Sequence, residues 1–330
     1  MRRSWGIWVH IGVLGVAASL AWFTSGRADE PTSSHIPSVD LWKVDVDQVR
    51  NISFDATDRR VHVESKRDNV GGYAVVTVET SIQPTTPDAG VSVVPSWQKK
   101  RFISVESAEK LLEGMARFRT LRTIGKLEGK RAAEFGFDKP SGTLKIVFTN
   151  GSRMLTLGAT TPGGGNYYVR DEQTGLVLVA VGEPISTIQY AEGRMTERDL
   201  HGFKTDEIVR IAVQAGGKLR QLVRVAGKAN GWADPKTPLV QDETASNWVS
   251  KLSQLRATAY EEKYQSTPTP LLRVEYGDAK SNLGFVELFR VTAINEPEKF
   301  IVRSERTRWY AEVIKSQAEQ IERDASLIAK

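Results

Sequence analysis

The side chains that most often perform catalysis or bind metals are scarce in this chain. None of its 330 residues is Cys, which excludes thiol catalysis, disulfides and Cys-ligated metal sites. Of its four His, His62 falls in a strand pattern and His201 in a linker. Each would need a Ser or a carboxylate placed by the fold before it could act as a base. The sequence therefore predicts no catalytic residue, no metal site and no cofactor, in a protein that is not an enzyme.

Three consecutive glycines, Gly163 to Gly165, resemble the loop of a phosphate-binding site. They lack the Lys-Ser/Thr pair of a P-loop, and no clear helix pattern follows whose N-terminus could hold a phosphate. A glycine hairpin between two strands is therefore the expectation.

Two acidic clusters could supply paired carboxylates. Asp171 and Glu172 are adjacent, but adjacent strand residues point to opposite faces, so we expect an exposed pair at a turn. Glu197, Arg198 and Asp199 mix both signs of charge, which predicts a solvated turn.

Positive charge is concentrated in the stretch from Lys99 to Arg131, which holds ten basic and four acidic residues. It could face anionic lipid or an acidic partner, whereas a plain solvated helix face would need no partner. The chain has 45 basic and 40 acidic residues, and residues 1–28 hold three Arg and no acid, so the remainder is nearly neutral. That balance does not indicate a nucleic-acid partner.

The N-terminus carries the clearest signal. Trp5 to Phe23 is a run of 19 residues without a formal charge. As a helix it would span roughly 28 Å, close to the hydrocarbon thickness of a bilayer. Arg2 and Arg3 before the run favour a cytoplasmic N-terminus and a periplasmic body, in a bacterial inner membrane crossed once. We predict a membrane anchor over residues 1–28; a signal peptide cleaved before Asp29 is the alternative.

Behind the anchor, residues 29–40 are Pro/Ser-rich and predict an extended tether. Alternation of apolar residues then predicts strands around Ile52, Val61 to Val63 and Tyr73 to Val78. Glu79 to Lys100 contains three Pro and predicts a long loop, and Ser104 to Arg122 predicts a helix capped by Ser104 or Ser107. Further patterns predict strands at Leu144–Phe148, Met154–Leu157, Tyr167–Val169 and Leu176–Val181, and a short helix at Glu183–Gln189.

The second half repeats this order of patterns. The strand pattern at Ile211 is followed by a predicted helix at Glu243–Ala259, strands at Leu272–Tyr276, Phe300–Arg303 and Trp309–Val313, and a last helix. We therefore predict an α+β fold: an N-terminal transmembrane helix and two tandem, diverged copies of a β-rich unit, over 41–199 and 200–330. The sheets are expected to be mainly antiparallel, with packed helices.

Several segments, taken in order, resemble the bacterial family of domain of unknown function 4340. They are Phe135 to Pro140, the strand Leu144 to Thr149 with the Asn150-Gly151 turn, Leu157 to Arg170, and Arg194 to Leu200. The resemblance covers about residues 41–330, although the stretch Glu79–Lys100 departs from the commoner pattern. It implies a single-span anchored protein, often encoded beside an ABC-type permease and a gliding-motility-type auxiliary subunit. It brings no established activity and no functional residues.

These observations predict a non-enzymatic, membrane-tethered periplasmic accessory or scaffold protein, associated with an ABC-type transport system. Its partners would be the membrane and an ABC permease or auxiliary subunit. The alternatives are a periplasmic module that binds envelope glycan or lipid and, with less support, a hydrolase.

Overall fold

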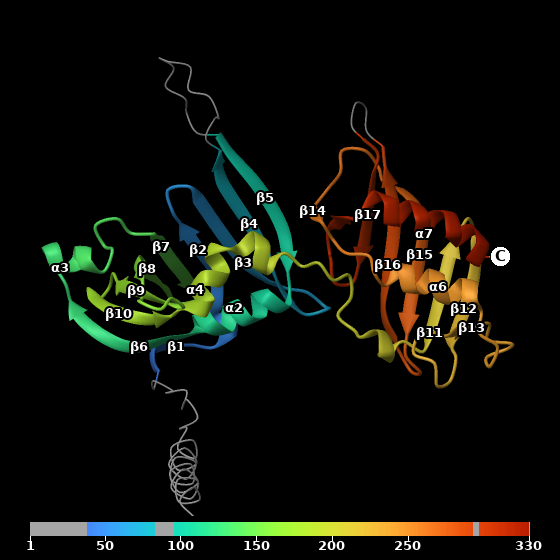
Figure 1. The fold of residues 1–330 in the computed structure, drawn as a ribbon, viewed down its shortest axis with the longest axis horizontal. Helices are drawn as coiled ribbons and strands as arrows, with labels where there is room; N and C mark the ends of the chain where they lie inside the picture. Colours follow the sequence, from blue (N-terminus) through green and yellow to red (C-terminus); the bar gives the residue numbers. More distant parts are fainter. Residues whose placement is uncertain (1–37, 83–95, 293–296, 330) are drawn as a thin grey trace, which may run out of the picture. The chain divides into compact units, whose positions relative to one another are not determined.

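The computed structural model describes residues 38–82, 96–292 and 297–329. They form two mainly antiparallel sheets with packed helices (Figure 1), as the α+β prediction requires. The predicted anchor, and residues 29–37 of the predicted tether, lie outside the described residues. At the other end of the predicted tether, Val39 and Asp40 belong to the first strand and not to an extended linker. No helix within the described ranges has the length and apolar character to cross a membrane.

The first sheet contains ten strands, the first of which begins at Val39 and the last of which ends at Val181. Their order is β1-β6-β10-β9-β8-β7-β2-β3-β4-β5. Their bounds are β1 Val39–Lys43, β2 Val49–Asp55, β3 Arg59–Arg67, β4 Gly72–Ile82, β5 Ser96–Ser104, β6 Arg117–Lys126, β7 Gly142–Phe148, β8 Gly151–Thr160, β9 Asn166–Asp171 and β10 Leu176–Val181. The helices of this half are η1 Val46–Gln48, α2 Glu106–Ala116, α3 Gly129–Glu134, α4 Gly182–Gln189 and α5 Ala191–Met195.

Alternating apolar residues build the core of this sheet. Ile52 lies opposite Val63 on one side and Ile146 on the other, and all three are buried. Because cross-strand partners share a face, the three side chains lie on one face of the sheet. The period-two prediction for these strands is therefore confirmed.

The predicted long loop at Glu79–Lys100 is wrong at both ends. β4 continues to Ile82, and Ser96–Lys100 is already strand, with Glu79 opposite Lys99 in the register. Most β5 residues before Phe102 are exposed, so this edge strand lacks the apolar alternation that reveals a half-buried strand.

The predicted helix at Ser104–Arg122 is correct only in its first part. α2 ends at Ala116, and Arg117–Lys126 forms β6, in which buried Phe118 and Thr120 alternate with exposed Arg residues. Phe118 fits both the helical spacing of apolar residues and the alternation of a strand, so the sequence pattern does not mark the boundary between α2 and β6. Neither predicted cap is made: Ser104 is buried at the end of β5, and Val105 occupies the N-cap without a side-chain hydrogen bond.

The second sheet contains eight strands in the order β13-β12-β11-β15-β16-β17-β18-β14. Their bounds are β11 Arg210–Ala215, β12 Lys218–Arg224, β13 Trp232–Ala233, β14 Ala259–Glu261, β15 Thr269–Gly277, β16 Asn282–Val291, β17 Lys299–Ser304 and β18 Tyr310–Glu312. The helices are η2 Thr205–Glu207, α6 Glu243–Leu252 and α7 Lys315–Ile328, and the last two pack against each other (Figure 1).

α6 is shorter than the predicted helix at Glu243–Ala259. Asp242 caps its start by accepting a hydrogen bond from the amide of Ala245 at 2.9 Å. The helix ends at Leu252, and buried Leu255 lies in the turn that leads to β14. Leu255 continues the apolar spacing of the helix in the sequence, although the helix itself ends before it.

Eight strands of each sheet have the same order relative to the chain. The run β4-β3-β2-β7-β8-β9-β10-β6 corresponds position by position to β13-β12-β11-β15-β16-β17-β18-β14. Along the chain, helix α2 lies between β5 and β6, and helix α6 lies between β13 and β14. In the sheets, β14 is an edge strand and β6 is next to the edge strand β1. A helix also follows the last strand of each set, and it packs on the earlier one: α4 on α2, and α7 on α6.

Candidate functional site

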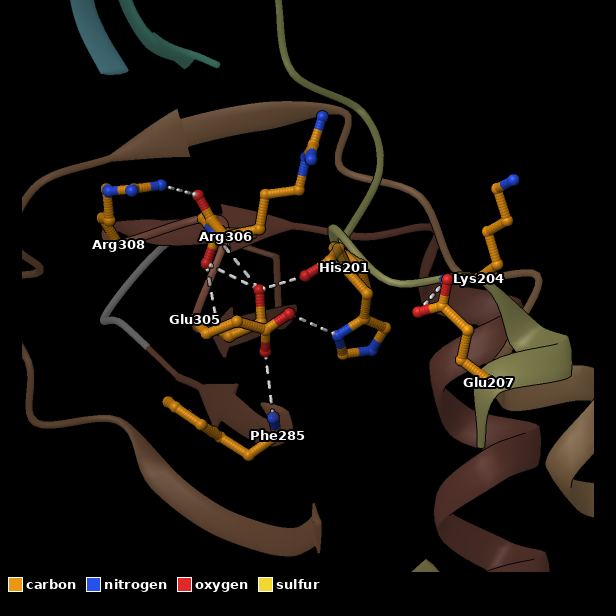
Figure 2. A network of polar contacts seen from close by, with 10 residues as sticks. His201, Lys204, Glu207, Phe285, Glu305, Arg306 and Arg308 are labelled. Atoms are coloured by element: carbon orange, nitrogen blue, oxygen red, sulfur yellow. Dashed lines mark hydrogen bonds and ion pairs between the residues drawn. The ribbon is translucent and has the colours of Figure 1, made fainter. Parts of the chain in front are cut away.

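A network of polar contacts in the second half lies at the turn between β17 and β18, residues 305–308 (Figure 2). The turn is fixed from within, because the Ser304 amide donates to Thr307 Oγ1 at 3.0 Å and the Thr307 amide donates to Ser304 Oγ at 3.2 Å. Ser304 Oγ in turn donates to the carbonyl of Leu200. Arg308 has a φ of 57° and is the one non-glycine residue with positive φ in the described ranges. Such a conformation persists only where its surroundings hold it.

Glu305 and His201 form the centre of the network. His201 Nδ1 lies 3.0 Å from Glu305 Oε1, and Glu305 Oε2 accepts the amide hydrogen of Phe285 at 2.9 Å (Figure 2). The two side chains are 18% and 15% exposed, so the pair is largely shielded from water. Both carboxylate oxygens of Glu305 therefore lie within hydrogen-bond distance of a protein nitrogen.

Aromatic rings enclose the imidazole. His201 stacks on Phe203 with ring centroids 4.7 Å apart and meets the edge of Tyr276 at 4.8 Å. Burial, and next the charge of Glu305, raise the pKa of the Tyr276 phenol far above its usual range. A phenol held neutral in this way does not act as a base near neutral pH.

One glycine is required for this packing. A Cβ at Gly284 would lie 2.4 Å from the Glu305 carboxylate and 2.8 Å from the ring of Phe203. Any larger residue would displace the pair.

Arg306 joins the turn to the segment that precedes β11. Its Nη2 lies 2.9 Å from Glu197 Oε2, with side chains 15% and 9% exposed. Tyr260 donates its hydroxyl hydrogen to the Glu197 carbonyl at 2.7 Å. The predicted solvated turn is therefore wrong for Glu197, although Arg198 and Asp199 are exposed.

Arg308 makes the third connection of the turn. Its guanidinium donates to both carboxylate oxygens of Asp68, at 2.8 and 3.2 Å, and lies 4.4 Å from the centre of the Tyr73 ring. The hydrogen bond from Arg308 holds the pKa of Asp68 below its usual value. A single turn thus contacts the β3–β4 turn, the segment before β11 and the β16 backbone.

A cleft of about 670 Å³ lies between Lys99–Phe102 of β5 and Thr258–Lys263 around β14. Arg101 enters it, with its guanidinium 4.9 Å from the Trp309 ring centre and 2.9 Å from Glu262 Oε2. This volume is in the range of small-ligand pockets. Its walls carry aromatic rings and both signs of charge.

The adjacent carboxylates of Asp171 and Glu172, predicted to form an exposed pair at a turn, differ in burial. Asp171 is completely buried, where it accepts hydrogen bonds from the Thr174 hydroxyl at 2.8 Å and the Gln173 amide at 3.2 Å. The prediction of exposure is therefore wrong for Asp171. Glu172 is exposed, and its Oε1 accepts a hydrogen bond from the Thr156 hydroxyl at 2.6 Å.

The glycine run is a hairpin, as predicted. Gly163, Gly164 and Gly165 have φ values of 87°, 75° and 82° and connect β8 to β9. Only glycine adopts three such conformations in succession without strain.

His62 does have a Ser beside it. Its Nδ1 lies 3.0 Å from Ser53 Oγ across the β2–β3 pair, on an exposed surface. No carboxylate is bonded to the other ring nitrogen in the described part of the chain, and no cluster of three or more metal-ligating side chains occurs there. The orienting group of a Ser-His-acid arrangement is thus missing among those residues.

Sequence reasoning missed the main contributors to the network: Glu305, Arg306, Arg308 and Asp68. The available signal was the run Glu305-Arg306-Thr307-Arg308, in which three charges interrupt two strand patterns. Solvated turns carry such charges too, so the run does not reveal that its side chains are buried.

Comparison with known proteins identifies one family. The family model described as Domain of unknown function (DUF4340) matches residues 105–273. No curated protein and no solved structure matches the chain. Some of the residues that carried the resemblance serve the architecture: Phe135 packs edge-on against Tyr168 at 4.7 Å, and a Cβ at Gly136 would lie 2.6 Å from the Ala159 amide.

Proposed function

This chain belongs to the family of domain of unknown function 4340, and from that membership we propose that it is a non-enzymatic, membrane-tethered extracytoplasmic accessory or scaffold protein. The observation that carries the proposal is the uncharged run Trp5–Phe23 behind Arg2 and Arg3. Its length suits a single span, and the two Arg residues favour a cytoplasmic N-terminus. The body would then lie in the periplasm.

The polar network supports a structural role for the body. Each of its charged groups has a protein partner: Glu305 with His201, Glu197 with Arg306, and Asp68 with Arg308. A carboxylate that acts directly on a substrate needs an oxygen open to that substrate, and these oxygens face protein donors instead. The network is suited to fixing the turn against its neighbours.

The partner that we propose is an ABC-type permease or its auxiliary subunit. This follows from the resemblance, in which such subunits are often encoded alongside. A tether limits the body to surfaces near the bilayer, where a high effective concentration lets a weak interface suffice.

We also propose that the two halves, 41–199 and 200–330, are diverged copies of one unit. The support is the shared order of eight strands and two helices. The first unit adds β1 and β5 at the ends of its sheet.

A pull-down of the full chain from native membranes in mild detergent tests the function. Co-purification of permease and ATPase subunits in fixed proportion would support the proposal. Recovery of the chain without any transporter subunit, under conditions that keep known membrane complexes intact, would refute the transport association.

The cleft beside Trp309 favours one second candidate, a module that binds envelope glycan or lipid. Aromatic rings beside polar groups suit sugar rings and amphipathic headgroups. Purified envelope polymers should then bind the full chain, and Trp309→Ala should weaken binding by tenfold or more. No saturable binding to the native chain would remove this candidate.

A hydrolase has the least support, which comes from the Ser53–His62 contact and the His201–Glu305 pair. If His62→Gln abolishes function while the melting temperature is unchanged, the non-enzymatic proposal fails.

A further inference from the structure

The cations of the stretch Lys99–Arg131 divide into two groups in the structure. Those at its start are paired: Lys99 with Glu79, Lys100 with Glu192, Arg101 with Glu262, Lys110 with Glu106 and Arg117 with Asp40. Those at its end are Arg119, Arg122, Lys126, Lys130 and Arg131, which are exposed and have no ion pair with any residue in 38–82, 96–292 or 297–329. Lys126 pairs with Leu176 and lies on the same side of the sheet as Thr120. We name the other four, Arg119, Arg122, Lys130 and Arg131, the β6–α3 basic face.

The strand register places two of these cations on one side of the sheet. Thr120 pairs with Ala180 and Arg122 with Val179, and the register shifts between these pairs. A bulge adds one residue, so Arg119 and Arg122 both lie opposite to the buried face that holds Thr120.

The α3 segment covers the same side. Val179 also pairs with Tyr168, whose ring is contacted by Phe135 at the end of α3. Tyr168, Val179 and Arg122 therefore share one face of the sheet. Lys130 and Arg131 belong to the helix that leads into Phe135, so they add their charges beside Arg119 and Arg122.

The chain enters the body next to this face. β1 is the neighbour of β6, and the two strands are joined by the Asp40–Arg117 ion pair at 2.9 Å and by stacking of Trp42 on Phe118 at 4.6 Å. About twelve residues separate the predicted anchor from Asp40, and an extended chain of that length reaches roughly 42 Å at most. Under the proposed function, the start of β6 therefore stays near the bilayer surface.

The positive charge of the β6–α3 basic face suits a negatively charged partner surface. Residues 117–134 hold six basic and two acidic residues. Anionic headgroups attract such clusters over about one Debye length, and Arg binds phosphate oxygens through two parallel hydrogen bonds. We propose that the β6–α3 basic face docks on the anionic phospholipid surface of the membrane that holds the tether. This inference rests on the proposed tethering and adds an orientation of the body to it.

The absence of Cys allows a test with one labelled position. The full chain with Ala133→Cys, an exposed position of α3 two residues after Arg131, carries a fluorophore in vesicles with a headgroup-located quencher. Ala279→Cys, exposed in the second half, is the reference position. Vesicles contain either neutral phosphatidylcholine alone or 30% phosphatidylglycerol (about one lipid in three, as suits a surface-potential test).

Two matched variants separate local from overall charge. The test variant combines Arg119→Gln, Arg122→Gln, Lys130→Gln and Arg131→Gln. The control combines Lys218→Gln, Lys236→Gln, Lys280→Gln and Arg323→Gln, four cations that are exposed and unpaired in the same described ranges. Both remove four charges, and a melting temperature within about 2 °C of the parent shows that each is folded.

We expect quenching at position 133 to be at least threefold greater in anionic than in neutral vesicles, and to exceed that at position 279. The test variant and 0.5 M salt should abolish the difference, which the control variant should retain. Equal quenching in both vesicle types, or equal loss in both variants, would overturn the docking proposal; an acidic protein partner would give the first of these results. A chain that fails to enter vesicles of either kind would instead refute the tethering on which it rests.

Discussion

Arg306 Nη2 lies 2.9 Å from Glu197 Oε2, and the ion pair joins the turn before β18 to the segment between α5 and β11. Both side chains are largely buried, and the Glu197 carbonyl also accepts the hydroxyl of buried Tyr260. Removal of one partner from a buried pair leaves an uncompensated charge, which costs more than the pair contributes.

Glu197→Ala should therefore lower the free energy of unfolding by about 3 kcal/mol. Asp199→Ala is the matched control, because its pair with Arg256 is more than half exposed and should change stability by less than about 1 kcal/mol. Urea unfolding of the full chain in detergent, followed by Trp fluorescence, measures both. Equal effects of the two substitutions would show that the Glu197–Arg306 pair has no special role.

Gly284→Ala should destabilise the second sheet by about 2 kcal/mol, because the new methyl group overlaps the Glu305 carboxylate. Gly72→Ala is the control, since a Cβ there meets nothing within 4 Å. Thermal unfolding compares the two. If the melting temperature of Gly284→Ala equals that of Gly72→Ala, the close packing around Glu305 is not as the structure has it.

The Asp68–Arg308 contact predicts a pH dependence. Hydrogen bonding to Arg308 lowers the pKa of Asp68 in the folded state below the value of 3.8. A group with a depressed folded pKa contributes stability above its unfolded pKa and loses that contribution as pH falls through the folded one. The stability difference between the parent and Asp68→Asn should therefore be constant above about pH 5 and decline below about pH 4.

In an Arg308→Gln background, Asp68→Asn should lose most of this pH-dependent effect. Denaturant unfolding of the four variants at several pH values between 3 and 7 (a range that brackets the usual Asp pKa of about 4) completes the double-mutant cycle. A difference that grows as the pH falls would have the wrong sign for this account.

Removal of the anchor should separate folding from function. A body without residues 1–28, exported by a cleavable signal, should keep the thermal stability of the anchored chain but complement a deletion poorly at native abundance. The reason is the lost effective concentration near the membrane. Full complementation by the free body at native abundance would favour a soluble binding protein or an enzyme.

The strands that were predicted well are those with one buried face. Ile52, Val63 and Ile146 alternate with polar residues because only one side of their strands meets the core. β5 escaped prediction because residues such as Lys99 and Arg101 are exposed on an edge strand, where burial imposes no pattern. The α2–β6 boundary escaped because Phe118 fits both periods.

The polar network could not be predicted at all. His201 was a visible candidate, but its partner Glu305 lies in another element, and the pairing depends on the β17–β18 turn and on the backbone space at Gly284. Sequence periodicity reports which face of one element is buried and not which charges meet across elements. The prediction that Glu197 is solvated is wrong for the same reason.

The central claim, a tethered body outside the cytoplasm, is tested most directly by a pair of topology reporters. One reporter that is active only in the periplasm and one that is active only in the cytoplasm are fused in turn after Lys330, and each product is assayed in carbonate-washed membranes. The account predicts periplasmic activity in the membrane fraction and none from the cytoplasmic reporter. Activity of the cytoplasmic reporter, or release of the full-length fusion by carbonate, would contradict it.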